Sequence, residues 1–270
     1  MKLFACMCNQ PQRLAEALAP VRAMLVADGP VSRWGMGYIQ GEDALLVRTP
    51  KSSAQPVDLA APLYEALLPG SDCIIVQAVR DTREPGLGGT DNTPPFRFRR
   101  WMFAQTGVLE LSDAAPRLLT HVPEFLRRNL KGRTPAELMF HVYLAMLHDE
   151  GSIDDPNLPA QAMRRALASM LKLVSAELAK AGQPDAAIGN IALTNGRAMV
   201  CARLGAPLRL RRLWVLDDRG ERDAGFRGVL VVSGAEGEAT EGFDGFEDVP
   251  VRSAVLISRD LQFHLADLSL

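Results

Sequence analysis

The sequence predicts an α+β fold in which two β-sheets carry helices on their outer faces. Segments with strand patterns fall into two groups, within residues 3–106 and 187–258, and a block of helical patterns over residues 118–180 separates them. This order is typical of sheets with helices packed outside them. No internal repeat and no long linker divides the chain, so we expect residues 1–270 to form one domain.

The first group begins with a buried strand over residues 3–8, followed by a helix over residues 11–28 that Pro20 kinks or interrupts. A hairpin follows, with strands at 34–40 and 44–47 joined by the turn Gly41-Glu42-Asp43. The remaining elements of this group are a short helix at 59–67, a buried strand at 73–79, a loop at 81–95 and a strand at 100–106.

Helical spacing of apolar residues predicts helices over residues 118–129, 135–148 and 161–180. The second group of strands follows at 187–194, 198–202, 210–215, 228–233 and 254–258, with a turn signal at Asn195-Gly196. The acidic, glycine-rich stretch over residues 234–248 is predicted to be an exposed loop.

Composition excludes several classes of function. The 30 basic and 32 acidic residues give a formal net charge of −2, which offers no general attraction for nucleic acid or an anionic membrane. No apolar run is long enough to span a bilayer, and the start of the chain lacks an export signal. We therefore expect a cytoplasmic protein with no nucleic-acid or membrane partner, and with reduced thiols at Cys6, Cys8, Cys73 and Cys201.

The sequence predicts no metal site and no cofactor. His141 and His148 share one helix face, but no third ligand has usable spacing, so a solvated or helix-capping role is expected. A second cluster mixes basic and aromatic side chains, namely Arg97, Arg99 and Arg100 with Phe96, Phe98 and Trp101. Such a cluster suits RNA or phosphate, but simple alternation along a strand, with aromatics inward and arginines outward, explains it more simply and is the preferred interpretation.

Several segments, in order along the chain, resemble the class II (N-terminal nucleophile) glutamine amidotransferases, in particular the stand-alone type related to the ergothioneine-pathway amidohydrolase. No one of these motifs is specific, but their order is. The resemblance implies the four-layer αββα sandwich of N-terminal nucleophile hydrolases. The segments that carry it are Leu3-Phe4-Ala5, Arg33-Trp34-Gly35-Met36-Gly37-Tyr38, Val76-Gln77-Ala78-Val79-Arg80, Asn92-Thr93-Pro94-Pro95-Phe96, Trp101 to Gly107, Arg127 to Glu137, Leu193 to Arg197 and Val231 to Pro250.

The resemblance implies an N-terminal cysteine nucleophile, and this chain has Met1 at that position. Lys2 is too large for ordinary removal of the initiator methionine, so we expect the mature chain to start at Met1, whose thioether cannot form a thioester. Cys6 or Cys8 would serve as nucleophile only after processing that exposed one of them, at the expense of the first strand.

Other positions of the implied site are also altered. Thr106 replaces the asparagine whose amide belongs to the oxyanion hole, while Gly107 keeps the backbone donor of that hole. Pro135 replaces an aspartate that binds the substrate amino group. Arg80 stands where the family places an arginine for the substrate carboxylate, and it is equally well explained as a strand-end arginine in a surface ion pair.

These replacements lead to two hypotheses. The first is a degenerate amidotransferase-like protein without glutaminase activity, which acts as a binding or partner subunit. The second is an active amidohydrolase of glutamine or a γ-glutamyl amide. It would be processed to Cys6 or Cys8, or use another nucleophile, for which Thr106 has the only hydroxyl at an informative position. The resemblance also offers residues for an amino-acid carboxylate ligand or for the fold itself, namely Arg80, Thr106, Gly107, Asn92, Thr93, Trp34 and Gly35.

Overall fold

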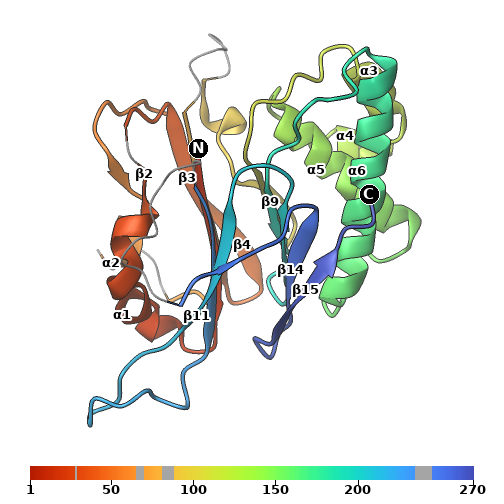
Figure 1. Ribbon diagram of the computed structural model, residues 1–270. Helices are drawn as coiled ribbons and strands as arrows, with labels where there is room; N and C mark the ends of the chain where they lie inside the picture. Colours follow the sequence, from red (N-terminus) through yellow and green to blue (C-terminus); the bar gives the residue numbers. More distant parts are fainter. Residues whose placement is uncertain (28, 65–69, 81–87, 235–244) are drawn as a thin grey trace.

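A computed structural model describes residues 1–27, 29–64, 70–80, 88–234 and 245–270. Two antiparallel sheets lie face to face, with α1 and α2 outside one sheet and α5 and α6 outside the other (Figure 1). The prediction of an α+β fold with two sheets between helices is therefore confirmed.

The first sheet has seven strands. Its centre is β1, which pairs with β12 on one side and with β6 on the other. In spatial order the strands are β13 (Glu247–Asp248), β11 (Leu208–Leu213), β12 (Gly228–Ser233), β1 (Lys2–Cys8), β6 (Cys73–Val79), β3 (Arg33–Gln40) and β4 (Asp43–Thr49).

The second sheet has six strands, and a separate pair of two-residue strands, β2 (Val26–Ala27) and β5 (Val57–Asp58), lies outside both sheets. The six strands in spatial order are β15 (Phe263–Asp267), β14 (Ser253–Ile257), β10 (Met199–Arg203), β9 (Ile191–Thr194), β8 (Trp101–Gln105) and β7 (Phe96–Phe98). The strands β4 and β7 are the edge strands at the same end of the two sheets, since Arg97 of β7 donates to the Ala44 carbonyl of β4.

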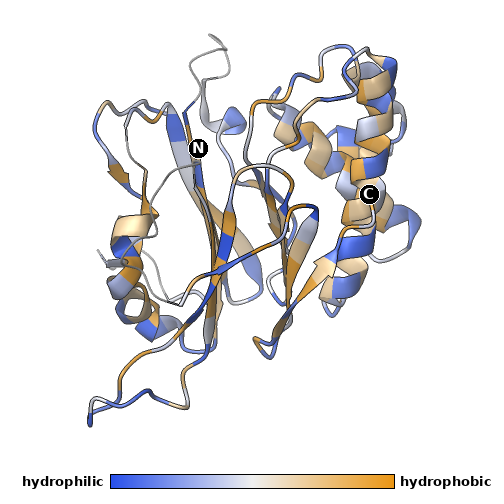
Figure 2. Cartoon of the chain, in the orientation of Figure 1, coloured by the Kyte–Doolittle hydropathy of each residue, from blue (hydrophilic) through white to orange (hydrophobic). Residues whose placement is uncertain are grey.

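Alternation along the strands divides the apolar residues into separate cores. In β1, Leu3, Ala5 and Met7 pack between the two sheets, whereas Phe4 and Cys6 pack on the outer face beneath α1. A further core joins the six-stranded sheet to α5 and α6. Figure 2 shows the apolar residues along the strands and on the inward side of the helices, as this arrangement requires.

The two long helices match their predicted ranges closely. Helix α5 (Pro135–Asp149) begins at the N-cap Thr134, whose hydroxyl accepts a hydrogen bond from the Glu137 N–H at 3.2 Å. Helix α6 (Ala160–Lys180) presents an apolar stripe to the second sheet and a polar face to solvent. Both are long and periodic, which are the properties that make a helix predictable.

Prolines divide two helices that were predicted to be continuous. The predicted helix over residues 11–28 is instead η1 (Pro11–Arg13), α1 (Leu14–Leu18) and η2 (Ala19–Leu25), because Pro20 cannot donate within an α-helix. The predicted helix over residues 118–129 is divided into α3 (Ala115–Thr120) and α4 (Glu124–Arg127), since Pro123 caps the second piece.

Smaller elements also differ from the predictions. The helix expected over residues 59–67 is α2 (Ala61–Tyr64), and the rest of that range lies outside the described residues. The loop expected over residues 81–95 contains η3 (Thr90–Asn92), and positions 81–87 are not described. The loop expected over residues 234–248 ends in β13, with positions 235–244 not described, and β15 was not predicted.

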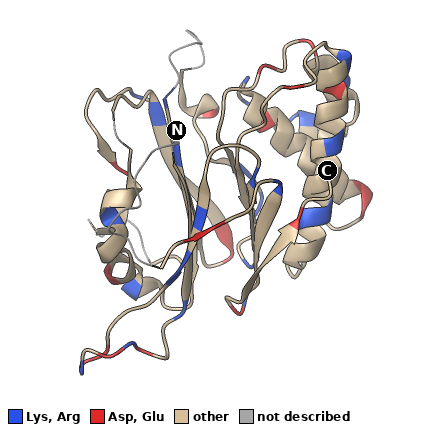
Figure 3. Cartoon of the chain, viewed as in Figure 1, with Lys and Arg blue, Asp and Glu red and all other residues tan. Residues whose placement is uncertain are grey.

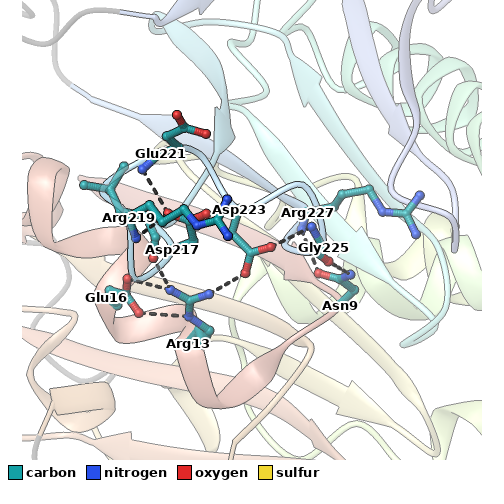
Figure 4. Close-up of polar contacts among 10 residues, drawn as sticks. Asn9, Arg13, Glu16, Asp217, Arg219, Glu221, Asp223, Gly225 and Arg227 are labelled. Atoms are coloured by element: carbon teal, nitrogen blue, oxygen red, sulfur yellow. Dashed lines mark hydrogen bonds and ion pairs between the residues drawn. The ribbon is translucent and has the colours of Figure 1, made fainter.

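The connection between β11 and β12 is a long hairpin that extends from the seven-stranded sheet (Figure 1). Figure 4 shows its anchor, in which Arg13 contacts Asp223 of the hairpin at 2.5 Å and Glu16 of α1 at 2.9 Å. The Asn9 side chain adds bonds to the Gly225 carbonyl and the Arg227 N–H, each at 2.7 Å. These contacts hold the base of the hairpin against the start of η1.

The environment of His141 corrects the expectation of a solvated histidine, because this residue is buried in α5 and its Nδ1 lies 2.9 Å from the Glu137 carbonyl. Burial lowers the pKa of His141 below its ordinary value. Within the described residues, no group of three or more His, Cys, Asp or Glu side chains is placed to hold a metal ion.

This histidine gives a testable pH dependence. Since its pKa is lower in the folded protein, the unfolded chain binds the proton more readily, and stability falls as the pH drops below about 6.5. We expect His141→Leu to remove this component, which contributes a slope of at most about 1.4 kcal/mol per pH unit. Urea unfolding of both proteins from pH 7 to pH 5 measures it. Parallel stability curves for wild type and His141→Leu would contradict the assignment.

Candidate functional site

A small cavity lies at the end of the two sheets where β1 begins. Its volume is about 50 Å³, enough for a few waters by the measure in which one water needs about 10–15 Å³. Strands β3, β6 and β8, the loop before β7 and the start of α5 all contribute to its walls. The lining residues include Met1, Arg33, Gln77, Val79, Asn92, Pro94, Phe96, Gln105, Gly107, Val108, Leu109, Thr134, Pro135 and Ala136.

Strand alternation explains which side chains reach this cavity. Gln77 and Val79 of β6 line the cavity, while Ala78 between them packs in the outer core. Val79 pairs with Arg33 of β3, so the guanidinium at the start of β3 reaches the same cavity. The register Lys2↔Ala78 places Met1 beside this end of β6.

Met1 lines the cavity next to Gly107. The Gly107 N–H donates to the Met1 Sδ at 3.1 Å. Gly107 has a φ of +102°, a conformation that favours glycine, and its backbone crosses that of Gly189 closely. The backbone donor that the sequence analysis singled out therefore points toward the residue at the expected nucleophile position.

Thr106 lies beside the cavity without lining it. Its N–H donates to the Asn190 carbonyl at 2.8 Å, and its hydroxyl lies 3.4 Å from the same oxygen. The Thr106 carbonyl accepts a bond from the Gln105 side-chain amide. The hydroxyl of Thr106 is thus directed to the neighbouring strand segment rather than toward Met1.

The loop before β7 is held by its own polar groups. Asn92 accepts from the Arg133 N–H at 2.7 Å, donates to the Gly88 carbonyl at 3.0 Å, and offers its carbonyl to Arg33 at 3.1 Å. Thr93 is fully buried and donates to the Gly89 carbonyl. Asn92 lines the cavity and Thr93 does not, so the first contacts both loop and cavity while the second stabilises the loop.

Trp34 and Gly35 lie on opposite faces of β3. Trp34 packs against the outer core near α1. Gly35 faces the other sheet, where an added Cβ would lie 2.4 Å from the Pro94 carbonyl oxygen and 3.0 Å from that of Val47. Trp34 and Gly35 therefore act through packing, which positions the strand and loop that form the cavity walls.

Arg80 follows β6, and alternation directs its side chain to the opposite face from Val79. Its guanidinium lies beside Gly29, where an added Cβ would be 3.8 Å from Cζ and Nη2. Of these two arginines, Arg33 lines the cavity and Arg80 does not. The cation at the cavity thus comes from the start of β3.

Gln77 is a polar lining residue that the sequence analysis did not select. It is nearly fully buried, its Nε2 donates to the Gln105 carbonyl at 2.7 Å, and its Oε1 has no hydrogen-bond partner in the described structure. A lone polar residue within the apolar run of residues 73–79 was the available signal.

At the start of α5, Pro135 lines the cavity while the Glu137 carboxylate turns back into the preceding loop. It accepts from the Gly132 N–H at 2.7 Å and the Lys131 N–H at 3.1 Å. Burial raises the pKa of Glu137, and these two N–H groups and Arg48 act in the opposite direction. Glu137 is the only acidic residue in the first turn of α5, and its carboxylate binds the loop before the helix rather than facing the cavity.

Cys6 and Cys8 lie in β1, between β12 and β6, away from the cavity lining. Both face the outer core and are buried. Burial raises the pKa of Cys8 to about 12 and that of Cys6 well above its ordinary value. In the folded chain both are protonated, poorly nucleophilic thiols.

No protein-family model and no curated protein matches the chain. Solved structures do. A glutamine aminotransferase class-II domain protein from Silicibacter pomeroyi is similar over 100% of both chains, with a TM-score of 0.60 and 15% identity. A predicted glutamine amidotransferase from Pseudomonas aeruginosa is similar over 97% of this chain and 99% of that one, with a TM-score of 0.55 and 15% identity. This chain therefore has the fold of the class II glutamine amidotransferase domain proteins.

Proposed function

We propose that this protein is a catalytically degenerate class II glutamine amidotransferase-like protein, with the four-layer sandwich of N-terminal nucleophile hydrolases, that works as a binding or partner subunit. The observation that carries the proposal is the contact between the Gly107 N–H and the Met1 Sδ at 3.1 Å. A thioether has no ionisable proton and cannot supply the thiolate on which acyl transfer by such an enzyme depends.

The surroundings of this contact support the same function. The oxyanion that forms in acyl transfer needs preorganised donors aimed at it, and the second donor expected here is replaced by the Thr106 hydroxyl, which is directed toward Asn190. Pro135, at the position of the amino-group acceptor, offers neither charge nor N–H. Glutamine hydrolysis at this cavity would therefore lack three of its chemical groups.

The rival function, hydrolysis after processing to Cys6 or Cys8, has a structural cost. Cleavage before Cys6 would remove Lys2 to Ala5, which pair with Ala78 to Ile75 on β6. Leu3 to Ala5 also pair with β12 on the other side. Removing half of the central strand would expose backbone groups and the core that Leu3 and Phe4 fill.

A binding role has its own support in the cavity. Arg33 brings a guanidinium to the lining, and Gln77, which also lines the cavity, has a buried Oε1 without a hydrogen-bond partner. Together they suit a carboxylate and an N–H donor, such as those of an amino acid. Because the cavity of about 50 Å³ holds only a few waters, an amino acid would bind only if lining side chains moved aside. In this proposal Arg33, rather than Arg80, meets the carboxylate.

Intact-mass measurement and a glutaminase assay on the same purified sample test the proposal. We expect a mass that includes Met1, and no release of ammonia from glutamine or γ-glutamyl amides above that of heat-denatured protein. Calorimetry with glutamine then tests ligand binding, with Gln77→Leu as the variant that removes the acceptor. A mass starting at Cys6 or Cys8 together with ammonia release would overturn the proposal in favour of the hydrolase.

A further inference from the structure

A larger cavity lies at the rim where the edge strands β4 and β7 meet the segment before α5. Its volume is about 530 Å³. Its charged lining residues are Arg48, Arg97, Arg99, Lys131, Asp91 and Glu137, and Phe125 of α4 forms part of its wall. We propose that this cavity, called here the rim groove, binds a small organic phosphate. The rim groove shares Phe96 with the cavity at Met1, and the proposal does not depend on the proposed function.

The charge of the rim groove favours an anion. Four cationic side chains face two carboxylates. Because Asp154 outside the groove pairs with Arg99, the local excess is one positive charge, in a protein whose net charge is −2. One of the two carboxylates, Glu137, is already held by the N–H groups of Lys131 and Gly132. In the view of Figure 3, acidic and basic residues are interspersed over the molecule.

Two of the cations, Arg48 and Arg97, are oriented by carbonyl groups rather than by ion pairs, although the Glu137 charge acts on Arg48 from farther away. Arg48 donates to the Pro95 carbonyl at 2.6 Å and the Thr90 carbonyl at 3.2 Å, and Arg97 donates to the Ala44 carbonyl at 2.6 Å. Within the described residues, no carboxylate oxygen lies within 4 Å of the charged nitrogens of Arg48, Arg97 or Lys131. Guanidinium groups already held in place lose little freedom on binding an anion.

A neighbouring cavity of about 440 Å³ serves as an internal comparison. It shares Arg97 and Arg99 with the rim groove and adds Arg100, but it also contains three carboxylates, Glu42, Asp43 and Asp154. Asp154 forms an ion pair with Arg99. Its three cations, two of which also line the rim groove, face three carboxylates, so the neighbouring cavity has no excess of positive charge.

The aromatic wall indicates the organic part of the ligand. Phe125 is 39% exposed, which is high for a phenylalanine, and the edge-to-face contact with His148 holds its ring. An exposed ring beside cations is suited to a flat group attached to a phosphate, since every nucleobase can stack on such a ring. Phosphate suits a mixture of two guanidinium groups and an ammonium better than a planar carboxylate does, because its oxygens are tetrahedral and its charge is greater.

The test is calorimetric titration of the full chain with AMP, ribose 5-phosphate, inorganic phosphate and citrate, at low and high ionic strength. We expect AMP to bind with a Kd below about 1 mM, more tightly than the other three probes, and to weaken as salt rises. Phe125→Ala should weaken AMP roughly fivefold or more and leave ribose 5-phosphate unchanged.

Charge variants complete the test. Lys131→Gln and Arg97→Gln should each weaken AMP binding roughly tenfold, the typical effect of losing one charge-assisted hydrogen bond. Lys172→Gln and Arg165→Gln, at exposed positions of α6, are the matched controls and should change nothing. Thermal unfolding verifies that each variant is folded. No heat with millimolar AMP, equal affinity for AMP and inorganic phosphate, or equal losses in target and control variants would each overturn the proposal.

Discussion

Gly189→Ala is expected to prevent the native fold from forming, or to lower the free energy of unfolding by more than about 4 kcal/mol. A Cβ at this position would lie 1.5 Å from the Thr106 carbonyl oxygen, 2.2 Å from its carbonyl carbon and 2.8 Å from the Gly107 nitrogen. All of these are backbone atoms, so no change of rotamer relieves the overlap. The two chain segments would have to separate, and Thr106 would lose its 2.8 Å bond to Asn190.

Urea unfolding of the soluble protein measures this effect. If the variant shows no cooperative unfolding, the yield of folded protein is compared with that of wild type. Gly205→Ala is the control, because its nearest neighbour is the Gly189 Cα at 3.9 Å, an ordinary contact, and its φ is not in the left-handed region. We expect Gly205→Ala to stay within about 1 kcal/mol of wild type. If Gly189→Ala unfolded at the same urea concentration as Gly205→Ala, the close crossing of the two backbones would be wrong.

The parts of the fold that follow local periodicity were predictable. Strand β12 has its predicted bounds, and α6 begins one residue before its predicted start, because both have uninterrupted patterns. The helices near Pro20 and Pro123 were drawn too long, since apolar spacing alone cannot show where a proline ends the hydrogen bonding. Strand β15 was missed because it is an edge strand whose side chains are mostly exposed.

The site was predictable only in part, and for a different reason. The resemblance selected Gly107, Asn92 and Pro135, all of which line the cavity at Met1. It could not show that alternation turns Arg80 away from that cavity, or that Gln77 enters it from a buried strand. Gly189 went unnoticed because its role depends on Thr106, a residue that is remote in sequence. Contacts between distant segments leave no local pattern.

Asn190→Ala is the second substitution with a large expected effect. Asn190 is fully buried, and its side chain makes four hydrogen bonds. Its Oδ1 accepts from the Leu204 N–H at 2.9 Å and the Gly205 N–H at 3.0 Å. Its Nδ2 donates to the Ala206 carbonyl at 2.8 Å and the Ser233 hydroxyl at 2.9 Å. The residue thereby joins the turn after β10 to the end of β12.

Alanine would leave two N–H groups and one carbonyl of this turn without their partner. A buried polar group that loses its partner costs about 1–3 kcal/mol, so we expect a loss of about 3–6 kcal/mol in the free energy of unfolding. Asn157→Ala is the control, because this exposed asparagine makes a single side-chain bond to Arg197 and should cost less than about 0.5 kcal/mol.

Comparison with Ser233→Ala shows how much of the effect of Asn190→Ala comes from one hydrogen bond and how much from all four together. Ser233→Ala removes only one of the four contacts, so about 1 kcal/mol is expected from it in the same urea unfolding experiment. If Asn190→Ala cost no more than Ser233→Ala, the turn after β10 would find other partners and the network would not be needed. If it costs several times more, the amide is what holds the 204–206 turn against the first sheet. The backbone carbonyl of Asn190, which alanine keeps, also accepts the Thr106 N–H at 2.8 Å, so this residue links the 204–206 turn to the segment that leads to Gly107.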